Sequence, residues 1–206
     1  MKIYVIRHGE TELNVKRIKQ GWLDASLNQA GRDLARLTGQ ALQGIHFDAC
    51  FSSPLKRAWE TVEILLRESG NDIPVETDDR LKEIHFGDLE GFAPTPADAP
   101  KLRQFFGDPF SCPRFPNGET VREVCARTQE FLRELAGRDD GKTYLVSTHG
   151  CSLRAMLNPL YAAPAAFWHG HVPPNCSVSV IEAREGRMEL TGDDLILYEI
   201  SDVIDG

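Results

Sequence analysis

Two short apolar runs constrain the fold most, because each leads into a His-Gly pair. Residues 2–6 precede His8, and residues 143–146 precede His149. Both runs are rich in β-branched, aromatic and other apolar side chains, which is typical of strands buried on both faces of a parallel sheet. In an open α/β sheet, the ligand crevice lies outside the carboxyl ends of the strands. We therefore expect two histidines that are far apart in the sequence to meet at one edge of the sheet.

Amphipathic segments between these runs predict helices. Apolar residues recur at helical spacing over residues 30–41 and again over residues 55–66. Thr120 and Glu123 form the signature of a capping box, so a third helix is expected to begin there. A fourth helix is expected over residues 150–157. The two apolar stripes are predicted to consist of Ala30, Leu34, Leu37 and Ala41, and of Leu55, Ala58, Trp59, Val62, Leu65 and Leu66.

The C-terminal part of the chain predicts more strands. Residues 177–183 and 187–190 flank Arg184-Glu185-Gly186, a pattern typical of a hairpin, and residues 195–200 predict one further strand. Strands and helices alternate before this point, which favours an α/β fold. We expect residues 1–206 to form one domain, a three-layer sandwich with a mostly parallel central sheet and helices on both faces.

The segment 91–118 interrupts this alternation. It is rich in proline and phenylalanine and has little periodicity beyond a turn of helix near residues 101–106. Long irregular segments in compact domains are usually functional loops, so we interpret it as a cap over the site. The alternative is a surface excursion whose phenylalanines plug onto the core. These side chains are Phe92, Phe105, Phe106, Phe110 and Phe115.

Charge and cysteine content limit the partners and the compartment. The formal net charge of −8 argues against nucleic acid or an anionic membrane, because both require a basic face. The sequence contains no apolar run of about eighteen residues, and residues 1–6 are too short for a signal peptide. The five cysteines are scattered and never form CxxC, which favours reduced, buried thiols in the cytoplasm. They are Cys50, Cys112, Cys125, Cys151 and Cys176.

The residues around the first histidine favour a phosphate site. Arg7 and His8 bring a guanidinium, an imidazole and neighbouring backbone amides to the end of a strand. Ser53 suits the N-cap of the next helix and Pro54 its first position, so Arg57 is expected one turn in. Guanidinium groups match phosphate geometry bidentately, and a helix N-terminus favours an anion. A small anionic substrate is therefore expected.

Four motifs in this order resemble those of the histidine phosphatase superfamily, the phosphoglycerate-mutase-like enzymes. They are R-H-G-E-T at residues 7–11, S-P-L-K-R at 53–57, L-x-E-x-x-F-G-x-x-E-G at 81–91 and S-T-H-G at 147–150. The resemblance extends over nearly the whole chain. It implies the fold of that family and an enzyme that carries a phosphoryl group on a histidine.

The resemblance also implies roles for individual residues. His8 is expected to attack phosphorus as a neutral imidazole and to become a phosphohistidine. Glu83 is expected to protonate the leaving alkoxide and then to accept a proton from water, while His149 donates to the phosphoryl oxygens. Arg7 and Arg57 offset phosphoryl charge, so no metal or other cofactor is expected. Substrate contacts are implied for Asn14, Gln20 and Gly21.

Two site assignments have alternatives in the sequence. Neighbouring carboxylates compete with Glu83 for the role of acid: Asp79, Asp88 and Glu90. His169 and His171 are spaced like a metal pair, but no third ligand lies in register, so we predict no metal site there.

The activity itself has three interpretations. Residues 149–156 resemble the cofactor-dependent phosphoglycerate mutases, but those enzymes carry a longer basic insertion where this chain has only Lys101, Arg103 and Arg114. We therefore predict a phosphatase that hydrolyses a small-molecule phosphomonoester. The alternatives are a mutase and a non-catalytic phospholigand-binding domain. The short members of the family include α-ribazole phosphatase-like and broad-specificity enzymes, so the sequence does not select one substrate. Dimers are common in the family, so a homodimer is possible, but no sequence feature identifies an interface.

Overall fold

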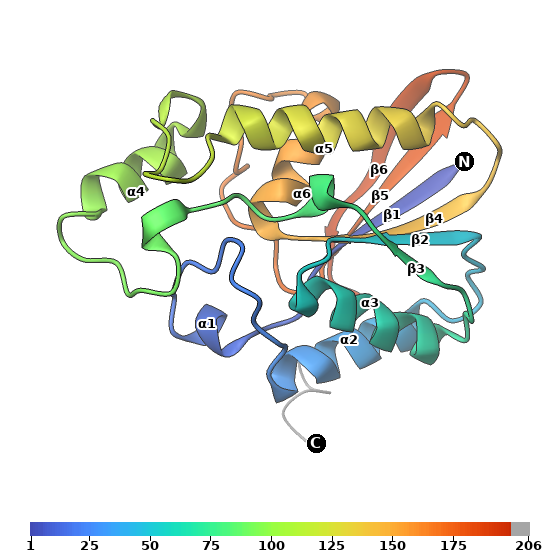
Figure 1. The fold of residues 1–206 in the computed structure, drawn as a ribbon. Helices are drawn as coiled ribbons and strands as arrows, with labels where there is room; N and C mark the ends of the chain where they lie inside the picture. Colours follow the sequence, from blue (N-terminus) through green and yellow to red (C-terminus); the bar gives the residue numbers. More distant parts are fainter. Residues whose placement is uncertain (199–206) are drawn as a thin grey trace.

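A six-stranded sheet forms the centre of the computed structural model, which describes residues 1–198 (Figure 1). The strand order is β3-β2-β4-β1-β5-β6. The first four of these are mutually parallel, and β5 and β6 are antiparallel to their neighbours. This mostly parallel sheet confirms the predicted α/β class. The strands are β1 (Lys2–Arg7), β2 (Ala49–Ser52), β3 (Val75–Thr77), β4 (Thr143–Thr148), β5 (Val178–Arg184) and β6 (Arg187–Leu195).

Helices cover both faces of the sheet, as predicted for a three-layer sandwich. In Figure 1, α5 and α6 lie above the sheet, and α2 and α3 lie below it. Along β4, Tyr144 and Val146 pack with the first pair while Leu145 packs with the second, so this strand is buried on both faces. The helices are α1 (Glu12–Val15), α2 (Gln29–Ala41), α3 (Lys56–Ser69), α4 (Ala99–Gly107), α5 (Val121–Ala136) and α6 (Gly150–Leu157), with short 3-10 turns η1 (Asp79–Leu81), η2 (Gly87–Leu89), η3 (Pro109–Ser111) and η4 (Asn158–Leu160).

The start of α5 confirms the predicted capping box. The Thr120 side chain accepts from the Glu123 amide, and the Glu123 side chain accepts from the Thr120 amide. Helix α6 also has the predicted bounds. Within residues 1–198, no helix combines the length and the apolar character needed to cross a bilayer.

The packing face of α2 differs from the predicted stripe. The buried residues are Gly31, Ala35, Thr38 and Gly39, whereas Leu34 is half-buried and Ala41 is exposed. Small residues allow α2 to approach α3 closely: a Cβ added at Gly39 would lie 2.8 Å from the Leu65 carbonyl oxygen. On α3 the predicted stripe is buried except for Trp59, which is 37% exposed.

The predicted start of α3 is wrong by two residues. The helix begins at Lys56 with Leu55 as its N-cap, so Ser53 and Pro54 lie before it. Ser53 does not cap the helix, because its hydroxyl contacts His149. Arg57 accordingly lies in the first turn of α3.

The predicted hairpin is confirmed, with a longer second strand. Glu185 and Gly186 both have positive φ, 53° and 74°, as a tight two-residue turn requires. Strand β6 extends to Leu195, and residues 196–198 are not in a strand. The predicted strand at 195–200 is therefore wrong over this part, and its last two residues lie outside the described residues.

Segment 91–118 contains α4 and packs partly into a core of its own. Phe105 and Phe115 are buried with Trp168, which fits the interpretation of a plug. Phe92 and Phe106 are 70% and 42% exposed, which does not fit that interpretation. The predicted turn of helix near residues 101–106 is confirmed as part of α4.

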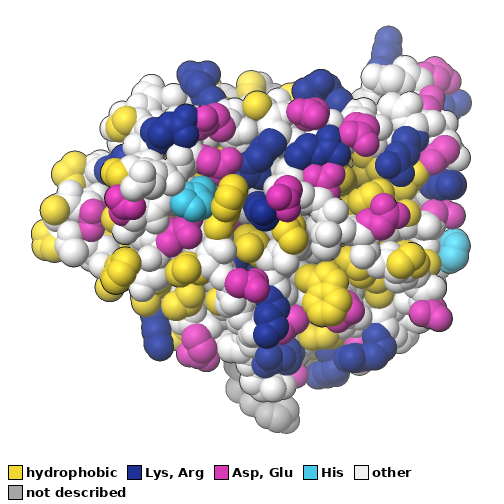
Figure 2. Space-filling view, in the orientation of Figure 1, with side chains coloured by type: hydrophobic (Ala, Val, Ile, Leu, Met, Phe, Trp, Pro, Cys, Tyr) yellow, Lys and Arg dark blue, Asp and Glu magenta, His cyan; other side chains and the backbone are white. Residues whose placement is uncertain are grey.

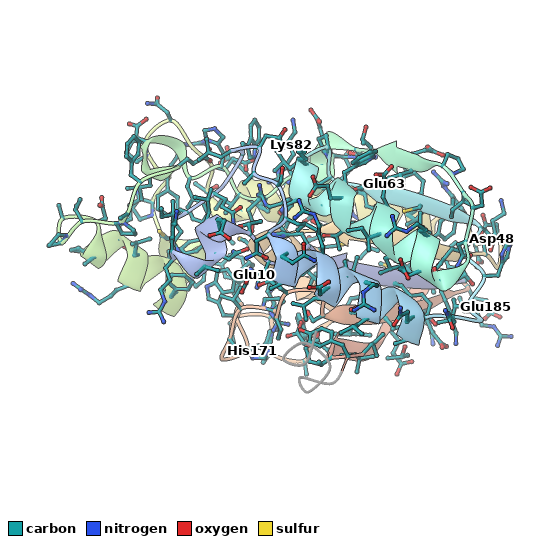
Figure 3. All side chains as sticks on the ribbon, turned by 90° about the horizontal axis from the view of Figure 1, so that it is seen from below. Glu10, Asp48, Glu63, Lys82, His171 and Glu185 are labelled. Carbon is teal, nitrogen blue, oxygen red and sulfur yellow. The ribbon has the colours of Figure 1, made fainter. Side chains whose placement is uncertain are left out.

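Figures 2 and 3 show how charged side chains are distributed over the molecule. On the face in Figure 2, basic and acidic side chains are intermixed. In Figure 3, Asp48 and Glu185 lie at one end of the molecule, while Glu10, Lys82 and His171 lie near its middle. Strand β1 ends at Arg7, so its carboxyl end lies on the side of Glu10 and not at the end with Asp48 and Glu185.

Candidate active site

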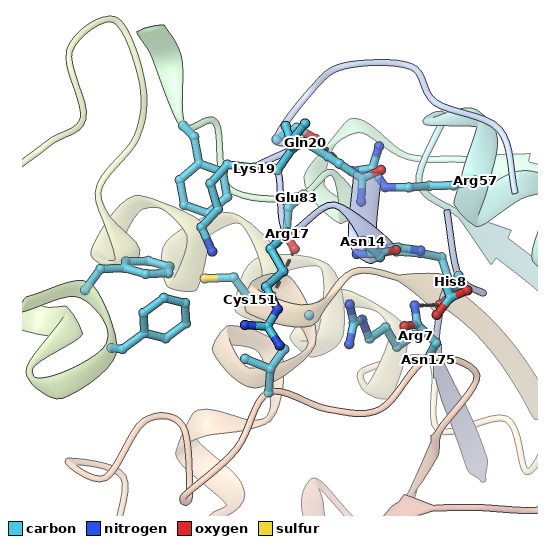
Figure 4. Close-up of a pocket in the computed structure, with 18 of the residues that line it drawn as sticks. Arg7, His8, Asn14, Arg17, Lys19, Gln20, Arg57, Glu83, Cys151 and Asn175 are labelled. Carbon is cyan, nitrogen blue, oxygen red and sulfur yellow. Dashed lines mark hydrogen bonds between the residues drawn. The ribbon is translucent and has the colours of Figure 1, made fainter. Parts of the chain in front are cut away.

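A cavity of about 490 Å³ opens at the carboxyl ends of β1 and β4 (Figure 4). His149 is the one predicted site residue that does not line it directly, but its ring centroid lies 5.1 Å from that of His8. The structure thus brings the two distant histidines together. The predicted residues that line the cavity are Arg7, His8, Asn14, Gln20, Gly21, Arg57 and Glu83.

His8 is held as a neutral imidazole with a defined tautomer. The residue follows directly after β1, and its side chain is buried. Its Nδ1 lies 2.7 Å from the Gly9 carbonyl oxygen, which can only accept, so Nδ1 carries the proton. Burial, and then the charges of Arg57 and Arg7, hold the pKa of His8 well below its ordinary value. The Nε2 lone pair is therefore available at neutral pH.

The backbone amide of Gly9 is not available to a ligand, contrary to the sequence-based expectation. Its N–H donates to the Thr61 hydroxyl at 2.9 Å, and the His8 N–H donates to the Thr148 carbonyl at 3.0 Å. The anion-binding capacity at this strand end therefore comes from side chains.

His149 is held as a neutral hydrogen-bond donor. Its Nε2 lies 2.8 Å from the Ser53 hydroxyl oxygen, which also accepts from the Leu55 amide at 3.3 Å. In the described part of the chain, His149 Nε2 is the only acceptor within hydrogen-bond distance of this buried hydroxyl, so the Ser53 O–H donates to Nε2 and the ring proton lies on Nδ1. Burial, followed by the charge of Arg57, lowers the pKa of His149 well below its ordinary value. Within residues 1–198, Nδ1 is buried without a partner, and a ligand oxygen would satisfy it.

The two predicted arginines are oriented by backbone carbonyls. Arg57 donates from NH1 to the Leu23 carbonyl at 2.8 Å and from NH2 to the Gly21 carbonyl at 2.7 Å. Arg7 donates from NH1 to the Pro173 carbonyl. Burial lowers the pKa of Arg57 to about 10, so it remains charged at neutral pH. In the described part of the chain, the Nε atoms of both arginines are buried without a partner.

Glu83 lies at the N-terminus of α6. Its Oε1 accepts from the Ser152 amide at 3.1 Å and its Oε2 from the Cys151 amide at 3.3 Å. Figure 4 shows the carboxyl group directed into the cavity. A carboxyl oxygen at this place can exchange a proton with a bound ligand.

The three competing carboxylates lie outside the cavity lining. Glu90 accepts from the Phe86 and Trp22 amides at 2.8 and 3.0 Å, and it lies where a Cβ at Gly21 would collide with it. Asp88 accepts from the Asn117 amide group at 2.9 Å, and Asp79 pairs with a lysine. These contacts are structural.

Thr11 orients two amide side chains that were implied to bind substrate. The Thr11 hydroxyl lies 3.1 Å from the Asn14 oxygen and 3.0 Å from the Gln20 oxygen, and its backbone N–H also donates to Asn14. Because the oxygens face Thr11, the two NH₂ groups remain as donors. Gly21 follows with φ of 48°, in the region that favours glycine.

Several lining residues were missed by the sequence analysis. Arg17 and Lys19 come from the loop after α1, and Asn175 precedes β5. No periodicity singles out a lysine or an arginine in a short loop. The aromatic lining residues are Phe86, Phe105, Phe106 and Trp168, and Cys151 also lines the cavity although all five cysteines are buried and free.

The two histidines with metal-like spacing have other partners. His171 lies 2.8 Å from an Asp194 carboxylate oxygen, and the His169 ring packs on Tyr161 with a centroid distance of 3.9 Å. Over residues 1–198, no three side chains of His, Cys, Asp or Glu are grouped as metal ligands.

Comparisons with known proteins agree on one family. The model of the histidine phosphatase superfamily (branch 1) matches residues 3–193. A 2,3-bisphosphoglycerate-dependent phosphoglycerate mutase of Cytophaga hutchinsonii is 33% identical over 161 residues, which cover 75% of each chain. The solved structure of Bacillus stearothermophilus YhfR matches with a TM-score of 0.87 and 31% identity over 98% of both chains. A mycobacterial glucosyl-3-phosphoglycerate phosphatase gives 0.81 and 27%, covering 94% of this chain and 98% of its own.

Proposed function

This chain belongs to the histidine phosphatase superfamily, as its four motifs predicted, and we propose that it hydrolyses small-molecule phosphomonoesters through a phosphohistidine. The observation that carries this proposal is the state of His8. Its ring is neutral, its proton is on Nδ1, and Arg7 and Arg57 lie beside it. A neutral Nε2 next to two cations suits attack on phosphorus.

The proposed reaction has two steps. In the first, His8 Nε2 forms a bond to phosphorus, the ester P–O bond breaks, and a protonated Glu83 gives its proton to the leaving oxygen. In the second, water attacks phosphorus, the P–N bond breaks, and Glu83 accepts the proton from water. Arg7 and Arg57 offset the charge on the equatorial oxygens, and the unpartnered Nδ1–H of His149 donates to one of them. No metal takes part in this mechanism.

Ser53 is expected to set the donor tautomer of His149. In Ser53→Ala the hydroxyl that faces Nε2 is lost, so the ring proton can move from Nδ1 to Nε2. We expect kcat to fall roughly tenfold because one donor to the transition state is partly lost. Ser52→Ala is the matched control, since that buried hydroxyl donates to the Ser53 carbonyl at 2.8 Å instead. The ¹⁵N shifts of the His149 ring report the tautomer, and unchanged shifts would contradict this assignment.

The composition of segment 91–118 supports hydrolysis over the mutase reaction, in which the phosphoryl group is transferred back to a substrate hydroxyl. None of its three cations lines the cavity: Lys101 lies 4.7 Å over the Phe115 ring, Arg114 donates to the Gly118 carbonyl at 2.8 Å, and Arg103 is exposed. The segment instead contributes Phe105 and Phe106 to the lining, which supports its proposed role as a cap. A mutase must retain its phosphohistidine and bind a second anion, and segment 91–118 places no cation in the cavity for that anion. A mutase is therefore the second candidate, which the name of the C. hutchinsonii relative favours.

One incubation separates the two candidates. The protein is mixed with 3-phosphoglycerate and catalytic 2,3-bisphosphoglycerate in excess chelator, with p-nitrophenyl phosphate assayed in parallel. We expect inorganic phosphate to be released without formation of 2-phosphoglycerate, and chelator to have no effect. Rapid isomerisation with little phosphate would establish the mutase instead. Activity restored only by added metal would contradict the proposed chemistry.

A further inference from the structure

The cavity is cationic although the whole chain carries a net charge of −8. Four basic side chains line it, Arg7, Arg17, Lys19 and Arg57, against two carboxylates, Glu10 and Glu83. The proposed mechanism uses Arg7 and Arg57 for the phosphoryl group and requires Glu83 to be protonated at the start. Three positive charges then remain in excess, and a phosphate dianion offsets two of them.

The remaining cations lie away from the phosphoryl position. Figure 4 shows Lys19 beside the aromatic rings and Arg17 in front of the cavity, with His8 and Arg57 on the other side. The Lys19 ammonium lies 4.7 Å from the centre of the Phe106 ring and 5.8 Å from that of Phe86. A charge and an apolar wall are therefore presented together.

Among the described residues, neither the half-buried Lys19 nor the exposed Arg17 has an anionic partner. Throughout residues 1–198, the side chains of Lys19 and Arg17 form no ion pair and no hydrogen bond. Burial lowers the pKa of Lys19, which reflects the cost of placing this ammonium in the cavity wall. Arg17 also has a φ of 55°, an uncommon conformation for a residue with a side chain. Unpaired cations in a concave, partly apolar site are typical of anion recognition.

We propose that Arg17 and Lys19 form a second anion subsite, which selects phosphomonoesters whose apolar or aromatic leaving group carries one carboxylate. The carboxylate would pair with Lys19 and Arg17, and the apolar part would pack on Phe86, Phe105 and Phe106. One carboxylate also offsets the positive charge that remains. This inference rests on the proposed function for the position of the phosphoryl group. It goes beyond the sequence-based expectation of a small anionic substrate, because it adds a second anionic group on that substrate.

The test measures binding, so that it does not depend on turnover. Benzyl phosphate and its meta- and para-carboxylated forms are titrated by calorimetry into the His8→Ala chain, which should leave the ligands intact. We expect at least one carboxylated form to bind about tenfold more tightly than benzyl phosphate, since a charge-assisted contact contributes about 1.4 kcal/mol or more. Adding Lys19→Met and Arg17→Met should bring the ratio of dissociation constants to near one.

The control is Lys16→Met, which removes an exposed lysine of the same loop that does not line the cavity. It should preserve the selectivity. A ratio near one in the His8→Ala parent, a ratio that survives the double substitution, or absence of binding by every ligand would overturn the subsite. Hydrolysis of benzyl phosphate by the unmodified chain tests the proposed function separately, so selective binding without hydrolysis would overturn only that function.

Discussion

His8→Ala is expected to reduce turnover by at least about a hundredfold, because it removes the proposed nucleophile, which would divide the reaction into two steps. Nε2 would no longer be present to attack, while Arg7, Arg57 and His149 would still bind the phosphoryl group. The fold should be unaffected, since His8 lies after the end of β1 and the sheet register involves residues 2–7. Steady-state hydrolysis of p-nitrophenyl phosphate measures the effect, and circular dichroism checks the fold.

The chain offers a matched control for this substitution. His46 is exposed and lies 3.9 Å from Asp48, which Figure 3 places at the end of the molecule away from Glu10, a residue that lines the cavity. His46→Ala should retain full activity. Labelling with ³²P-substrate, quenched in alkali to preserve phosphohistidine, should mark the unmodified chain and His46→Ala but not His8→Ala. Residual hydrolysis above about a hundredth of the original rate, or label retained without His8, would exclude His8 as the carrier.

Features encoded by neighbouring residues could be predicted from the sequence. The capping box of α5 needs only Thr120 and Glu123, which are three residues apart. Arg7 and His8 follow directly from the apolar run that forms β1, so the position of that run also determines theirs. The local pattern therefore predicted both the strand and the position of Arg7 and His8 at its end.

Features that depend on contacts between distant segments were not predicted. The hydrogen bond between Ser53 and His149 joins residues 96 positions apart, and it explains why Ser53 does not cap α3. Gly31 and Gly39 carry no apolar signal, yet their small size defines the packing face of α2. Size and apolarity are different properties, and the periodic pattern reports only apolarity.

The additional cations of the site illustrate the same limit. A lysine in a short polar loop is usually solvated, and beyond Arg7 and Arg57 the sequence analysis considered cations only in segment 91–118. Lys19 becomes a site residue because the chain brings Phe86 and Phe106 beneath it. The proposed second anion subsite therefore rests on contacts between distant segments, which the sequence pattern does not report.

Glu83→Gln is expected to slow alkyl phosphate esters by about 10²- to 10⁴-fold, the range of a general acid. An alkoxide is a poor leaving group and needs a proton as the P–O bond breaks. The p-nitrophenolate ion scarcely needs one, so p-nitrophenyl phosphate should lose far less activity in its first step. Paired measurements of kcat/KM on glycerol 3-phosphate and p-nitrophenyl phosphate give the difference.

Glu90→Gln is the matched control for Glu83→Gln, because both carboxylates accept from backbone amides, two at Glu90 and three at Glu83, but only Glu83 lines the cavity. A glutamine at position 83 can still accept through one oxygen, so thermal melting should show only modest destabilisation. If both esters lose activity equally, Glu83 orients the N-terminus of α6 and does not transfer the proton. If Glu90→Gln instead produces the dependence on leaving group, the acid is Glu90. A loss confined to the alkyl ester in Glu83→Gln assigns the proton to Glu83, because substrate binding and the attack by His8 are common to both esters.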